Sequence, residues 1–180
     1  MRKVLYILGQ LDDQDVDWMA RTGRRLLLQP GQTLITQGEA TPDLYVVIDG
    51  SLVVSAAGVG KLATLLSGEI VGEMSFVDSS PPSASVTAET ATIVLAIPKD
   101  DIEEKILDEP LFGLRFFRAL ALFLADRLRN TTKSRQAQNS KGQLGAAEVD
   151  ADELDEKLMD KLAVAGDRFD RLTKAVAAKR

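Results

Sequence analysis

The most specific stretch of the sequence is residues 72–88, which read GEMSFVDSSPPSASVTA. Gly72 and Glu73 follow a short apolar run, and we expect them to lead into a turn of helix over residues 74–77. Glycine lets the backbone approach a ligand closely. The free N–H groups at the start of a helix attract phosphate groups, and the Glu73 carboxylate could accept hydrogen bonds from sugar hydroxyls.

The second half of the stretch closes the same region from the other side. Ser83 and Ala84 come just after the Pro81-Pro82 corner and offer a hydroxyl and a backbone N–H. The whole stretch is therefore either a phosphate-binding segment or a capped helical turn between two strands.

Outward from this stretch, short apolar runs alternate with turn residues at intervals of about 8–12 residues. Many short strands separated by glycines are typical of a sandwich, barrel or jelly roll. The fold class that we predict is therefore mainly β, with helices at both ends. The candidate strands are residues 26–28, 33–35, 44–48, 52–55, 62–66, 84–88 and 92–97.

Helices are expected before and after the strands. A short one is predicted over residues 13–22, with Asp12 or Asp13 as its N-cap. Asp100 and Glu103 fit a capping box, which predicts a further helix at that point.

A longer helix is expected after Pro110, up to about residue 135. Two apolar rows run along it, and one of them has the 3, 4, 3, 4 spacing of a helix-pairing seam. If one row covers the β segment and the other meets a copy of itself, the chain is a homodimer through residues 111–135. The alternative is that both rows belong to the core of a monomer. The seam is Leu114, Phe117, Ala121, Leu124 and Leu128, and the second row is Phe112, Phe116, Leu120 and Phe123.

Three units are predicted along the chain. Residues 1–135 form the main domain, residues 136–150 are a linker rich in Gln, Asn, Ser and Gly, and residues 151–180 form an appendage. The appendage contains an amphipathic helix over residues 151–178, which needs a partner surface. That surface could be the dimer mate, the chain's own main domain or another protein.

Composition argues against an enzyme. The 180 residues include no His and no Cys, so a histidine base, a thiol nucleophile and the commonest zinc ligands are missing, and we expect neither catalysis nor a bound metal. The 22 basic and 27 acidic residues give a net charge of −5, which disfavours nonspecific binding to nucleic acid. No run is long enough to span a membrane and no export signal is visible, so the cytoplasm is the expected location.

The sequence resembles the cyclic nucleotide-binding domain, the β-roll shared by catabolite activator protein and the regulatory subunits of protein kinase A. Residues 30–50 look like its opening strands, residues 72–88 like its phosphate-binding cassette, and residues 98–129 like its following helices. The resemblance implies a β-roll that binds a cyclic mononucleotide, cAMP or cGMP. It assigns the ligand to Gly72, Glu73, Met74, Ser75, Pro82, Ser83 and Ala84, with Thr131 and Thr132 either contacting the base or forming a polar helix end.

One cassette position departs from the family. The usual ending P-R-[AS]-A has an arginine that pairs with the phosphate, and this sequence has Pro82 there. A charge-assisted hydrogen bond of that kind contributes roughly 1.5–3 kcal/mol. Lys61, Arg127 and Arg129 are the candidate cations that could replace it.

Two functions follow from the resemblance. The first is a nonenzymatic cyclic nucleotide sensor that relays its ligand state through the C-terminal helices. The alternative is a nucleotide-independent dimeric scaffold with a degenerate pocket, which docks a protein partner through the helix at residues 151–178. DNA binding is not expected, because too few residues follow the long helix for a winged helix-turn-helix.

Overall fold

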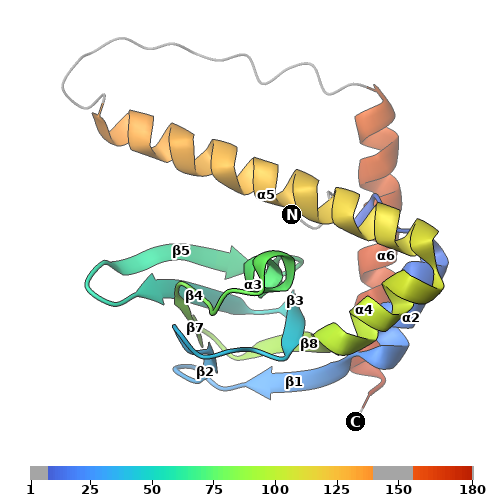
Figure 1. Ribbon diagram of the computed structural model, residues 1–180, viewed down its shortest axis with the longest axis horizontal. Helices are drawn as coiled ribbons and strands as arrows, with labels where there is room; N and C mark the ends of the chain where they lie inside the picture. Colours follow the sequence, from blue (N-terminus) through green and yellow to red (C-terminus); the bar gives the residue numbers. More distant parts are fainter. Residues whose placement is uncertain (1–7, 140–155, 180) are drawn as a thin grey trace.

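A computed structural model describes residues 8–139 and 156–179, with side chains from residues 8–129 and 163–179. Within these residues, eight strands form two four-stranded sheets, and the helices cover one side of the pair (Figure 1). The strands are β1 (Arg24–Leu28), β2 (Thr33–Ile35), β3 (Asp43–Asp49), β4 (Ser51–Ala56), β5 (Gly60–Leu66), β6 (Ile70–Val71), β7 (Ser85–Ala88) and β8 (Thr92–Pro98). The helices are α2 (Asp13–Thr22), α3 (Glu73–Asp78), α4 (Lys99–Asp108), α5 (Pro110–Asn139) and α6 (Glu156–Ala177).

The sheets have the strand orders β1-β8-β3-β6 and β2-β7-β4-β5, and every pairing is antiparallel. Strands that are distant in sequence are neighbours, as in a jelly roll or β-roll. The predicted class, mainly β with helices at both ends, is therefore confirmed.

The first of these sheets is buried on both faces. Successive side chains of a strand point to opposite faces, and in β3 Tyr45 and Val47 face the other sheet while Leu44, Val46 and Ile48 face the helices. β8 divides in the same way. This explains why nearly all of β3 is apolar, whereas a one-sided strand would alternate with polar residues.

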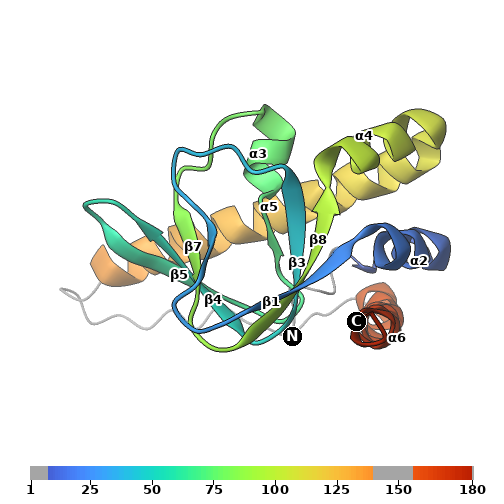
Figure 2. The ribbon, with the colours of Figure 1, turned by 90° about the horizontal axis from the view of Figure 1, so that it is seen from below.

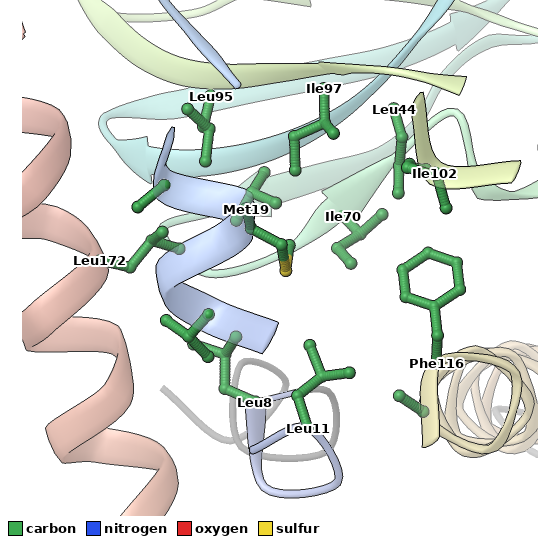
Figure 3. Close-up of a cluster of buried hydrophobic side chains, with 14 of the residues drawn as sticks. Leu8, Leu11, Met19, Leu44, Ile70, Leu95, Ile97, Ile102, Phe116 and Leu172 are labelled. Carbon is green, nitrogen blue, oxygen red and sulfur yellow. The ribbon is translucent and has the colours of Figure 1, made fainter. Parts of the chain in front are cut away.

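The second face of that sheet is covered by a helical core. Figure 3 shows Met19 of α2, Ile102 of α4 and Phe116 of α5 converging on Leu95 and Ile97 of β8. All five side chains are at most 1% exposed. Each large apolar side chain buried in this way contributes about 1.5–3 kcal/mol, so the helices are part of the folding unit.

The long helix α5 begins at Pro110, where a proline costs nothing because the first N–H of a helix has no intrahelical acceptor. It ends at Asn139, four residues beyond the expected end at residue 135. The predicted second row of this helix, Phe112, Phe116, Leu120 and Phe123, is buried in the helical core. Residues 136–139, the predicted start of the linker, therefore belong to this helix, whereas the predicted boundary between residues 150 and 151 lies outside the described residues.

The terminal helix α6 packs on α2 of the same chain, and Figure 2 shows the two side by side. Ala165, Leu172 and Val176 have no exposed surface. At one end of α2, Arg168 binds Asp13 and the carbonyl of Leu8. At the other end, Lys179 binds the carbonyl groups of Arg21 and Gly23. The apolar stripe of α6, which among the described residues includes Ala165, Leu172 and Val176, therefore covers the chain's own main domain.

Two local expectations need correction. The capping box predicted from Asp100 and Glu103 is not formed, because α4 already begins at Lys99, after Pro98, and has no side-chain cap. The two-residue strand β6 was not predicted, since two apolar residues carry no periodicity. At α2, by contrast, Asp12 is the N-cap and forms a reciprocal capping box with Asp15.

Candidate functional site

A pocket of about 150 Å³ lies where α3, the loop after it and α5 meet the inner faces of the sheets. Seven of the predicted ligand residues, Gly72 to Ser75 and Pro82 to Ala84, line it together. The complete lining is Ile35, Val54, Leu65, Val71, Gly72, Glu73, Met74, Ser75, Asp78, Ser80, Pro81, Pro82, Ser83, Ala84, Val86 and Arg127.

Gly72 makes the sharp turn from β6 into α3. Its φ of +91° lies in the left-handed region, and a Cβ there would lie 3.2 Å from the carbonyl oxygen of Asp43. A side chain would therefore be strained by the backbone conformation and crowded by β3. The turn places Glu73 as the first residue of α3, with its side chain in the pocket.

Glu73 is a buried carboxylate, only 2% exposed. Arg127 of α5 donates a hydrogen bond from Nη1 to its Oε1 at 2.6 Å (α3 and α5 are adjacent in Figure 1). Burial raises the pKa of Glu73 above its ordinary value, and the positive charge of Arg127 offsets part of that rise. A third group, Glu69, raises the pKa further. The pair joins the pocket to the long helix.

The opposite wall is the segment that leads into β7. The carbonyl of Pro82 accepts a hydrogen bond from the Gly38 N–H at 2.9 Å, and the Ser85 hydroxyl accepts one from the Gln37 N–H at 3.0 Å. These bonds hold the segment against the start of the roll. Since proline has neither a charge nor an N–H, Pro82 presents an apolar surface where the family pattern has arginine.

Of the three candidate replacement cations, Arg127 alone is among the described residues that line the pocket. Lys61 is paired with Glu89 at 3.1 Å on the surface of the second sheet, and Arg129 is exposed and outside the lining. Thr131 and Thr132 belong to the backbone of α5, but their side chains lie outside the described residues.

The outer face of α5 carries the predicted seam. Leu114 is 68% exposed, Phe117 47% and Leu128 69%, whereas Leu124 packs partly against the helical core. Phe117 also lies beside Phe76 of α3, with ring centroids 6.2 Å apart, so the fully outward side chains of the row are Leu114 and Leu128.

Neither a metal centre nor a membrane-spanning helix is present among the described residues. Among the described residues, no group of three or more acidic side chains is arranged to hold a metal ion. In the same part of the chain, every helix is too short or too polar to cross a bilayer.

Comparison with known proteins agrees with the fold. Residues 25–109 match the sequence profile of the cyclic nucleotide-binding domain. The cAMP-dependent protein kinase regulatory subunit of Yarrowia lipolytica is 32% identical over 102 residues, which are 56% of this chain and 27% of that protein. The cyclic AMP receptor protein of Thermus thermophilus is 33% identical over 123 residues, which are 66% of this chain and 55% of that protein.

A solved structure shows the same architecture. The cyclic nucleotide-binding domain from Methylobacillus flagellatus superposes with a TM-score of 0.69 and 21% identity, over 81% of this chain and 85% of that one. At this identity the likeness concerns the fold. The chain spans only about a quarter and about half of the two relatives by sequence.

Proposed function

We propose that the chain, whose residues 25–109 match the cyclic nucleotide-binding domain, is a nonenzymatic cytoplasmic sensor of a cyclic mononucleotide, cAMP or cGMP. The observation that carries the proposal is the contact between Glu73 and Arg127. It brings the cassette and the long helix together at one pocket, so a ligand that contacts Glu73 acts directly on α5.

In this proposal the sugar hydroxyls of the ligand contact Glu73, and the cyclic phosphate lies near Ser83 and Ala84 on the opposite wall. Glu73 is already ionically paired, so the ligand competes with Arg127 for its carboxylate. The position of Arg127 then depends on whether the pocket is filled. Ligand binding shifts α5 only if the two positions of the helix differ in ligand affinity.

Two further ion pairs support a relay beyond α5. Arg115 of α5 binds the buried Asp15 of α2 at 2.7 Å, and Asp13 of α2 binds Arg168 of α6 at 2.6 Å. A shift of α5 therefore changes the position of α2, and a shift of α2 changes the position of α6. We also propose that the exposed seam of α5 pairs with a second copy of the chain.

The test is calorimetric titration of the purified chain with cAMP and with cGMP. Saturable binding with one-to-one stoichiometry supports the proposal. Glu73→Gln should weaken binding at least tenfold, while the matched control Glu89→Gln, an exposed residue outside the pocket, should bind like the wild type. Equal binding by Glu73→Gln and the control would overturn the placement of the ligand.

A second candidate is a dimeric scaffold that has no nucleotide ligand. Pro82 favours it, because the wall lacks the cation that normally holds a phosphate. The same titration separates the two functions: a folded dimer that binds no nucleotide or nucleoside at millimolar concentration supports the scaffold. Its partner would then have to use a surface other than the apolar face of α6 at Ala165, Leu172 and Val176, which α2 covers.

A further inference from the structure

The charges around the pocket do not suit an anion. Among the described residues of the lining, the ionisable side chains are Glu73, Asp78 and Arg127. Arg127 is bound to Glu73 at 2.6 Å, so its charge is already balanced inside the protein. Asp78 adds a carboxylate without adding a cation. The ionised lining is therefore net negative by one charge before any ligand arrives.

The remainder of the lining is apolar or offers only neutral donors. Ile35, Val54, Leu65 and Val86 form the part that reaches between the sheets. The neutral donors nearest the presumed phosphate position are the hydroxyls of Ser80 and Ser83, and Pro82 between them contributes none. Hydroxyls can donate hydrogen bonds to a phosphate, but they carry no positive charge to balance it.

A cyclic phosphate diester brings one negative charge into this environment. It must give up water, and Arg127, the one cation among the described lining residues, is already the charge partner of Glu73, a carboxylate that is only 2% exposed. A nucleoside has the same base and sugar hydroxyls and competes with Arg127 for Glu73 in the same way, but it brings no charge into the pocket and needs no counter-ion. Its sugar can use Glu73 and its base can use the apolar wall.

From this arrangement we propose that the pocket binds the uncharged nucleoside at least as well as the corresponding cyclic nucleotide. The inference rests on the proposed function, because it takes the pocket to be a nucleotide site. It assigns recognition to the base and the ribose and removes the phosphate as the main source of affinity.

Calorimetric titration of the full chain with adenosine, cAMP, guanosine and cGMP tests the inference. The expected result is that the better-bound nucleoside has a Kd equal to or below that of its cyclic nucleotide. A cyclic nucleotide that binds more than about threefold more tightly than its nucleoside would overturn the inference and leave the proposed function intact. If none of the four ligands binds, both are overturned.

Two variants test the physical reason. Pro82→Arg supplies the missing cation and should tighten binding of the cyclic nucleotide by about ten- to a hundredfold, with the nucleoside changed by less than threefold. Asp78→Asn removes one negative charge, and the oxygen of the asparagine side chain can still accept the hydrogen bond that the Ser80 N–H donates to Asp78 at 2.9 Å in the wild type. This variant should raise the affinity for the cyclic nucleotide several-fold relative to the affinity for the nucleoside. It therefore serves as the test if Pro82→Arg does not fold, and an unchanged ratio of the two affinities in Asp78→Asn contradicts the charge argument.

Discussion

Arg115 holds the carboxylate of Asp15 with two hydrogen bonds, 2.7 Å from Nε to Oδ2 and 2.9 Å from Nη2 to Oδ1. Asp15 is 1% exposed and also belongs to the capping box of α2. A single buried carboxylate therefore fixes the start of one helix and ties it to another. The pair explains how α2, which is distant from the pocket in sequence, is held in place by the helix that lines the pocket.

The first prediction concerns this pair. Asp15→Asn should lower the free energy of unfolding by about 2–4 kcal/mol at pH 7, because Arg115 loses a buried, two-bond ionic partner and keeps the half-exposed Asp12 at 3.0 Å. Urea unfolding measures the change. Asp49→Asn, an exposed carboxylate at the end of β3, is the control and should change stability by less than about 0.5 kcal/mol.

The same pair predicts a pH dependence. Burial alone would raise the pKa of Asp15, but the hydrogen bonds from Arg115 and from the Asp12 N–H outweigh it and leave the pKa below the ordinary value. The folded state therefore binds fewer protons than the unfolded state in acid. The stabilising effect of the ionised Asp15 is fully present above about pH 4 and is lost as the pH falls through the lowered pKa. The difference in free energy of unfolding between the wild type and Asp15→Asn should therefore become smaller below pH 4. A difference that stays constant would contradict this prediction.

The second prediction concerns Glu73, whose pKa is shifted in the opposite direction. Burial raises its pKa despite Arg127, so between the unfolded and folded pKa values the folded state binds more protons. The contribution of Glu73 to the free energy of unfolding therefore falls as the pH rises from its pKa in the unfolded state to its higher pKa in the folded state. Arg127→Met should steepen this fall, because the buried carboxylate loses its counter-charge. The double variant Glu73→Gln/Arg127→Met should abolish it. Urea unfolding from pH 4 to pH 8 measures both slopes.

The strands were predictable because burial on one or two faces leaves a direct pattern in the sequence. The apolar run at Leu44–Ile48 and the separating glycines indicated a sandwich, barrel or jelly roll, and the family resemblance narrowed this to a β-roll. The α4 cap was predicted wrongly because Asp100 and Glu103 fit a pattern whose outcome depends on where the helix begins. Pro98 ends β8 and is itself the N-cap, two residues before the N-cap expected at Asp100.

The contacts between helices could not be predicted in the same way. Glu73 and Arg127 are 54 positions apart, and nothing in either segment identifies the other as its partner. Arg127 was only one of three candidate cations until the fold placed it at the pocket. The apolar stripe of α6 likewise fits any apolar surface, and only the structure assigns it to α2.

The third prediction concerns the seam of α5. Leu114→Glu and Phe117→Glu should each convert the proposed dimer to a monomer, because a charge at the centre of an apolar helix pair is strongly unfavourable. Light scattering coupled to size exclusion measures the mass. Leu107→Glu is the matched control, since Leu107 is 80% exposed but lies on α4, outside the seam. A wild-type chain that is monomeric at high concentration would contradict the proposed pairing.

The fourth prediction concerns α6, which the relay requires to be seated on α2. Leu172→Ala removes a side chain with no exposed surface and should lower the free energy of unfolding by about 2–5 kcal/mol. Val164→Ala, at a side chain that is 43% exposed on the same helix, should cost less than about 1 kcal/mol. If both variants unfold like the wild type, α6 does not pack on α2 in solution, and a shift of α2 cannot reach it. If Leu172→Ala alone is destabilised, ligand-dependent hydrogen exchange at residues 163–177 would show whether filling the pocket loosens or tightens the helix.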